Sequence, residues 1–207
     1  MRNPTIVVSL SRCGSSMVCG VLAACGARFG SPLKEADEFN PTGYWENLAA
    51  RKTFKRTLKR WRRKPDPLAR AAADMRSRMA GHWLDADTMK IPITWAHWPL
   101  IHAAYPRARW ILVRREVPDI VASCIRAPFM RGHDTPEAWT AWVEANVATL
   151  VALKETPINW VEIWPNPKDP DVFRPMVEHA GLTWDRAAVE AFLQPDLWRG
   201  RSREVAA

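Results

Sequence analysis

Apolar residues along this chain alternate between two spacings. Four short runs have the length and composition of β-strands, at residues 5–10, around 89–94, 109–114 and 158–163. Between them, apolar residues recur at helical spacing over 17–25, roughly 48–61, 95–104, 117–126, 136–154, 172–179 and 187–193. Strands that alternate with helices predict an α/β fold, with a parallel β-sheet flanked by helices on both faces.

The remaining segments bear on domain organisation. Residues 64–80, 127–135 and 165–170 read as excursions or loops, and none has the composition of a flexible interdomain linker. We therefore expect one domain, spanning residues 5–198. The longest apolar run, 17–27, is too short to span a bilayer, and the N-terminus shows no leader pattern. We expect a cytoplasmic protein with no membrane partner.

The net charge of +8 comes from one segment. Residues 51–64 hold nine Lys and Arg and no acid, so the rest of the chain has a net charge of −1. Phe54, Leu58 and Trp61 recur at i, i+4 and i+7, which predicts an amphipathic helix with one anchored stripe. Two interpretations stay open: a solvated helix face, or a surface that attracts an anionic cofactor, an acidic glycan or nucleic acid.

The first strand runs into a short polar turn that contains Arg12, Gly14, Ser15 and Ser16, and then into a helix. Such a junction directs backbone N–H groups and a helix N-terminus at one place, which suits a phosphate or sulfate. The Gly-Lys-Ser/Thr ending of a nucleotide-triphosphate loop is absent, which argues against an ATP-dependent kinase. An ordinary tight turn is the alternative interpretation.

A second candidate anion site lies at residues 109–123. The strand ends at Arg114 and Arg115, and a helix begins near Pro118, where proline is tolerated. Ser123 lies one turn beyond Asp119 on the polar face of that helix, so its hydroxyl could face an arginine at the strand end. A surface serine beside a solvated arginine pair is the alternative.

Three cations lie at or near the ends of three different predicted strands: Arg12, Lys90 and Arg115. In parallel α/β sheets, ligands bind beyond the carboxyl ends of the strands. These residues are therefore expected to converge on one anion site. The four cysteines, Cys13, Cys19, Cys25 and Cys124, lack metal-ligand spacing, so we expect reduced thiols and no metal.

Taken together, these motifs resemble the bacterial and phage-type sulfotransferases that use 3′-phosphoadenosine 5′-phosphosulfate (PAPS). The family's phosphosulfate loop corresponds here to Ser11-Arg12-Cys13-Gly14-Ser15-Ser16-Met17-Val18. Its Arg-x-Pro-x-Asp-x-x-x-Ser motif, counted back from Ser123, selects Arg115; the proline lies one position late, at 118, so Arg114 stays an alternative. Residues 40–47, 89–92, 178–182 and 191–195 extend the resemblance, although Ile91 replaces an acid of the family pattern.

The resemblance implies a P-loop-kinase-like three-layer sandwich and a nucleotide donor. The reaction would transfer a sulfuryl group from PAPS to a hydroxyl or amine of a glycan or small-molecule acceptor, leaving adenosine 3′,5′-bisphosphate (PAP), without a metal. The residues implied to bind the donor are Arg12, Cys13, Gly14, Ser15, Ser16, Met17, Arg115, Ser123 and, from a basic tail that also holds Arg201, Arg199.

Catalysis would need a fixed cation at the bridging oxygen and a general base for the acceptor proton. Arg12, assisted by Lys90, would supply the cation. Glu46, which ends an apolar segment, is the favoured base, and Glu35 is the second candidate. Either glutamate could instead cap or salt-bridge a helix, and His82, His97 and His102 are weaker candidates.

A different class of function also fits these residues. The chain could be a catalytically inactive P-loop-like protein that binds nucleic acid or an acidic partner through its basic helix, and the missing acid at Ile91 keeps this alternative open. The sulfotransferase interpretation predicts instead that nucleic acid is not the partner.

Overall fold

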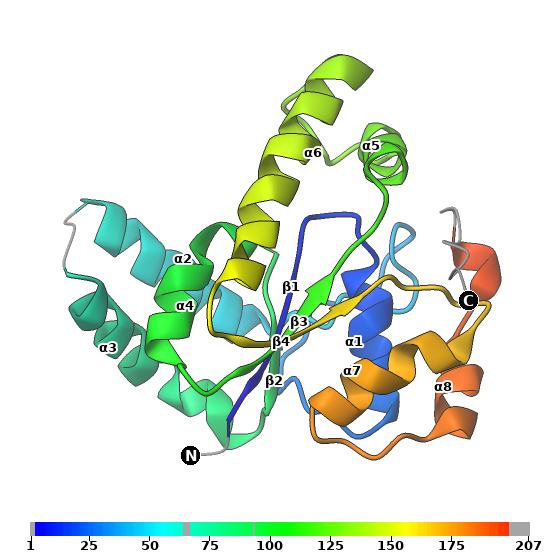
Figure 1. Ribbon diagram of the computed structural model, residues 1–207. Coiled ribbons are helices and arrows are strands. Elements are labelled where there is room, and N and C mark those ends of the chain that lie inside the picture. Colours follow the sequence, from blue (N-terminus) through cyan, green and yellow to red (C-terminus); the bar gives the residue numbers. More distant parts are fainter. Residues whose placement is uncertain (1–2, 64–66, 93, 199–207) are drawn as a thin grey trace.

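The computed structural model describes residues 3–63, 67–92 and 94–198 and has a four-stranded sheet at its centre (Figure 1). Within this part of the chain the strand order is β2-β1-β3-β4, and all pairs are parallel. The strands are β1 (Thr5–Ser9), β2 (Thr88–Lys90), β3 (Arg109–Val113) and β4 (Asn159–Ile163). Because every strand points the same way, their carboxyl ends share one edge of the sheet.

Helices cover both faces of the sheet, which confirms the predicted three-layer α/β fold (Figure 1). One group gathers on one side: α1 (Ser15–Ala24), α7 (Arg174–His179) and α8 (Arg186–Phe192). The other side holds α2 (Leu48–Arg63), α3 (Leu68–Met79) and α4 (Trp98–Ala104). Two more helices extend past the carboxyl edge of the sheet: α5 (Val117–Arg126) and α6 (Pro136–Val151).

In the described part of the chain, five short 3-10 helices extend or join these elements. They are η1 (Ala80–Leu84), η2 (Thr94–His97), η3 (Ala152–Glu155), η4 (Pro170–Phe173) and η5 (Pro195–Leu197). Three of them, η2, η3 and η4, account for residues that the hydrophobic spacing assigned to the neighbouring α-helices.

Two predictions about local structure were wrong. The segment 64–80, expected to be an excursion or loop, contains helix α3, whose Ala71, Ala72, Met75 and Met79 are buried. The sequence pattern did not reveal this buried face because two of its members are small alanines in a segment rich in charged residues. The strand expected around 89–94 ends at Lys90 because a turn begins at Ile91. The Ile91 carbonyl accepts a hydrogen bond from the Thr94 amide at 3.0 Å.

The core lies where the helices meet the sheet. Strands β1 and β3 are almost fully buried, and their β-branched and aromatic side chains fit a sheet that is covered on both faces. Helix α1 approaches α8 so closely that a Cβ on Gly20 would lie 1.9 Å from the Phe192 ring. None of the described helices is long and apolar enough to cross a membrane, and the four cysteines are free thiols.

Candidate functional site

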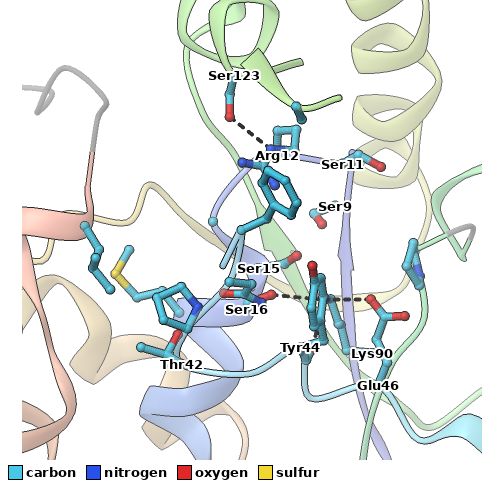
Figure 2. Close-up of a pocket in the computed structure, with 18 of the residues that line it drawn as sticks. Ser9, Ser11, Arg12, Ser15, Ser16, Thr42, Tyr44, Glu46, Lys90 and Ser123 are labelled. Carbon is cyan, nitrogen blue, oxygen red and sulfur yellow. Dashed lines mark hydrogen bonds and ion pairs between the residues drawn. The ribbon is translucent and has the colours of Figure 1, made fainter. Parts of the chain in front are cut away.

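A cavity of about 740 Å³ opens at the carboxyl edge of the sheet (Figure 2). The ends of β1, β2 and β3 contribute Ser9, Lys90 and Arg115 to its wall. The β1–α1 turn, helix α5 and the segment before α2 supply most of the rest. The lining residues from these parts are Leu10, Ser11, Arg12, Gly14, Ser15, Ser16, Met17, Ser123, Arg126, Lys34, Glu38, Phe39, Asn40, Pro41, Thr42, Tyr44 and Glu46.

The β1–α1 turn has the geometry of an anion-binding loop. Arg12 and Gly14 both have positive φ, of 69° and 87°, and Gly14 is the N-cap of α1 without any side-chain cap bond. The first N–H groups of a helix have no partner within it and carry its positive partial charge. The turn therefore directs the start of α1 into the cavity, beside the hydroxyls of Ser15 and Ser16.

Arg12, Ser123 and Arg115 join the β1–α1 turn to the region after β3. The Arg12 Nε donates to Ser123 Oγ at 3.0 Å, and the Arg115 Nη1 donates to the Arg12 carbonyl at 2.9 Å (Figure 2 shows the first contact). Arg115 is only 9% exposed, and burial lowers the pKa of its guanidinium. Its Nε is buried with no hydrogen-bond partner among the described residues. A buried, unpaired donor of this kind fits an anionic ligand group.

Arg114, the alternative to Arg115, has a different environment. Its guanidinium donates to Glu162 Oε1 at 2.9 Å and lies 5.1 Å from the centroid of the Trp164 ring. Arg114 is absent from the cavity lining, whereas Arg115 lines it and lies 4.4 Å from the centroid of the Trp198 ring. Of the two neighbouring arginines, the structure brings only Arg115 to the cavity.

Lys90 is the centre of a buried polar network. Its Nζ donates to Ser16 Oγ at 3.2 Å, to the Tyr44 carbonyl at 2.9 Å and to Glu46 Oε1 at 3.2 Å (Figure 2). The second carboxylate oxygen of Glu46 lies 3.3 Å from Arg51 Nη1. Two cations therefore surround a glutamate that is 4% exposed, in place of the apolar neighbours that its sequence context suggested.

Some residues singled out from the sequence lie away from the cavity. Glu35 is exposed and outside the lining, and His82, His97 and His102 are half-buried and also outside it. Cys13 belongs to the turn but packs into the core, where burial raises the pKa of its thiol to about 12. The cysteine can therefore offer a ligand its backbone but no thiolate. Arg199 and Arg201 lie outside the described residues.

The structure adds aromatic residues to the site that sequence reasoning missed. Phe39 and Phe129, from separate loops, meet edge to face with their ring centroids 5.3 Å apart, and both line the cavity. Trp198 lies against the turn so closely that a Cβ on Gly14 would be 2.8 Å from its ring. In the sequence these aromatics are isolated residues in irregular segments, so no periodic signal distinguishes them.

Tyr44, from the segment 40–47 that sequence reasoning did single out, is held on two sides. Its hydroxyl donates to the Asp37 carboxylate at 2.8 and 2.7 Å, and the Lys34 Nζ lies 3.1 Å from the ring centroid. Burial and the Asp37 carboxylate raise the pKa of the Tyr44 hydroxyl to about 12. These contacts fix the wall of the cavity that faces Lys90.

The charge balance of the cavity is strongly positive. Among the described residues that line it, six are cationic, and only Glu38 and Glu46 are acidic. The cations are Arg12, Lys34, Arg51, Lys90, Arg115 and Arg126. The same described residues contain no group of three His, Cys, Asp or Glu side chains placed to hold a metal ion. The arrangement therefore suits a ligand with several negative charges.

Comparison with solved structures shows which known proteins have a similar fold. No protein-family model and no curated protein sequence matches the chain. Among solved structures, the chain is similar to sulfotransferase STF9 from Mycobacterium avium, with a TM-score of 0.56 and 12% identity over 93% of this chain and 67% of that one. Sulfotransferase STF1 from Mycobacterium tuberculosis H37Rv gives a TM-score of 0.49 and 16% identity over 93% and 71%.

The chain thus has the P-loop-like α/β fold found in STF9. At this level of identity the similarity establishes the fold and not the reaction, because one fold hosts many functions. The activity has to be inferred from the site.

Proposed function

We propose that the protein is a PAPS-dependent sulfotransferase, with residues 5–198 as its one sulfotransferase-like domain. The acceptor would be a hydroxyl or amine of a glycan or small molecule. The observation that carries the proposal is one cavity with two anion-binding groups, the turn at 12–16 and the Arg115–Ser123 pair, linked by the 3.0 Å bond from Arg12 to Ser123. A donor with a 5′-phosphosulfate and a separate 3′-phosphate needs two such groups.

The residues of the turn would hold the phosphosulfate end of the donor. The candidates are the backbone of Arg12, Cys13 and Gly14, the hydroxyls of Ser15 and Ser16, and the neighbouring Met17. Arg115 and Ser123 would hold the 3′-phosphate, and the unpaired Arg115 Nε fits that role. Arg199, proposed from the sequence for the same phosphate, lies outside the described residues.

In the reaction, the bond between sulfur and the bridging oxygen breaks as a bond forms between sulfur and the acceptor oxygen or nitrogen. The leaving oxygen gains negative charge, so a nearby fixed cation and N–H groups stabilise the transition state. Arg12 and the first amides of α1 are proposed for this role. Lys90, which bonds to Ser16 in that turn, would assist them.

The acceptor proton needs a base, and the position of Glu46 supports it over Glu35. Glu46 lines the cavity and bonds to Lys90, whereas Glu35 is exposed outside the lining. Each carboxylate oxygen has two lone pairs, so the bonds to Lys90 and Arg51 leave acceptor capacity. We expect Glu46→Gln to lower sulfuryl transfer from radiolabelled PAPS by about 10²–10⁴-fold, with Glu35→Gln as the control. Full turnover by Glu46→Gln would eliminate this assignment.

Calorimetry with PAP in the presence of a chelator tests the donor site. We expect micromolar or tighter binding without metal, and a loss of about tenfold to hundredfold in Arg115→Ala, equivalent to one hydrogen bond to a charged group. Arg114→Ala is the matched control, because its side chain pairs with Glu162 outside the cavity. Absence of PAP binding, or magnesium-dependent binding of ATP in its place, would overturn the proposal.

A further inference from the structure

Helix α2 contains no acidic residue and packs against the rest of the protein through one buried face. Ala50, Phe54, Thr57 and Leu58 form that face, which leaves the Lys and Arg side chains at its sides and in solvent. At 3.6 residues per turn, Arg51, Lys55 and Arg62 fall within about 40° of arc on one flank of the helix. We call these three residues the basic row. Lys55 and Arg62 are exposed, and Arg51 is half-buried.

The basic row begins in the cavity. Arg51 lines the cavity, and its Nη1 lies 3.3 Å from Glu46 Oε2. From there the row runs along the helix for about 16 Å, at a rise of about 1.5 Å per residue. The basic row therefore connects the cavity wall to the exposed flank of the helix, although the sequence presented the two as separate features.

The far end of the row lies beside η2. The Arg62 Nη2 is 3.0 Å from the His97 Nε2. Burial and the charge of Arg62 lower the pKa of His97, so the ring stays neutral and leaves the charge of the row unchanged. The same short helix carries Trp95, which is half-buried and packs edge to face against Trp142, with the ring centroids 6.4 Å apart.

The donor accounts for only part of the positive charge in the cavity. The proposed donor contacts use Arg12 and Arg115, with Lys90 next to the reacting group. Lys34 and Arg51 also line the cavity and make none of those donor contacts, because Lys34 lies over the Tyr44 ring and Arg51 pairs with Glu46. Both belong to the part of the wall that holds Tyr44 and Glu46, where the base would act. Two cations and the two acidic lining residues, Glu38 and Glu46, therefore share the acceptor side of the cavity, and Arg51 is the cation there that continues into the basic row.

We propose that the basic row binds the acceptor, and that the acceptor is a linear acidic oligosaccharide. Its anionic groups would lie along Arg51, Lys55 and Arg62, with one hydroxyl next to the transferring group. A saccharide is favoured because each unit carries hydroxyls, whereas an internal stretch of DNA has no hydroxyl to accept a sulfuryl group. This inference rests on the proposed sulfotransferase function.

Fluorescence anisotropy on two variants of the full chain tests the row. Lys55→Gln/Arg62→Gln removes two charges from it, and Arg56→Gln/Arg63→Gln removes two charges from the same helix about 100° away. The probes are a labelled polyuronate hexamer, a neutral hexasaccharide of equal length and a single-stranded DNA 12-mer. We expect the polyuronate to bind, to lose about tenfold affinity in the row variant and less than about twofold in the control, and to weaken as salt rises.

Three outcomes would overturn the inference: no polyuronate binding, equal losses in both variants, or DNA binding that is tighter and depends on the row. Calorimetry with PAP separates this result from the proposed function. Neither variant touches the donor contacts, so PAP affinity should be unchanged in both. Failure of the unmodified protein to bind PAP would instead overturn the proposed function, independently of the polyuronate result.

Discussion

Replacing Gly14 with alanine tests how the turn before α1 builds the anion site. The residue has φ of 87°, where a side chain costs about 1–2 kcal/mol. The new Cβ would also lie 2.8 and 3.1 Å from Cζ3 and Cη2 of Trp198, and 3.6 Å from Cγ of Pro165. Overpacking of this kind costs about 1–3 kcal/mol. We expect Gly14→Ala to lower the free energy of unfolding by about 2–5 kcal/mol in total.

Gly26 provides a matched control on the same helix. Gly26 follows the last turn of α1 and has φ of 96°. A Cβ added there would meet no neighbouring atom within 4 Å. Gly26→Ala therefore carries the backbone cost alone, about 1–2 kcal/mol. The difference between the two variants isolates the contact with Trp198.

Urea unfolding and calorimetry with PAP measure the two consequences. Both variants should lose stability, Gly14→Ala by about 1–3 kcal/mol more. Only Gly14→Ala should lose PAP affinity, by about tenfold or more, because the amides at the start of α1 are displaced. If Gly14→Ala matched Gly26→Ala in stability and bound PAP like the unmodified protein, the turn would have neither the packing nor the role described above.

Three further predictions concern the rest of the structure. Met75→Ala should cost about 2–5 kcal/mol in urea unfolding, because Met75 is 1% exposed in α3; a cost below about 1 kcal/mol would mean that α3 does not pack as described. Cys13 should resist iodoacetamide at pH 8 until the protein unfolds, since a pKa of about 12 leaves on the order of one thiolate in ten thousand; rapid labelling of the native protein, mapped by mass spectrometry, would contradict this. Tyr44, with its pKa raised from 10.0 to about 12, should stabilise the fold fully below pH 10 and lose that contribution as the pH rises toward 12; ultraviolet titration should show its ionisation shifting downward in Asp37→Asn, and an unchanged titration would refute the contact.

The sheet could be predicted because its signals are local. The runs that became β1 and β3 are largely apolar and bounded by polar residues, and parallel strands place their carboxyl ends together. Arg12, Lys90 and Arg115 could thus be expected at one edge before any coordinates, and all three line the cavity. Helix α3 could not be predicted in the same way, because its buried residues Ala71, Ala72 and Met75 give little hydrophobic contrast with their neighbours.

The environment of Glu46 shows why the chemistry of the site was harder to predict. The sequence places an apolar segment before it, but Lys90 contacts it from 44 positions away. The same limit applies to Trp198 over Arg115 and to the Phe39–Phe129 pair, whose partners are distant in the chain. Periodicity carries no information about such pairs, because tertiary contacts create them.

Six cations around one cavity also repel each other, and folding has to overcome that repulsion. An anion that binds only the native state relieves it and shifts the folding equilibrium by mass action. The half-life of this protein in a cell would then follow the supply of its anionic ligands, because proteases act on the unfolded fraction. These cations would in this way link the abundance of the protein to the availability of the anions that bind it.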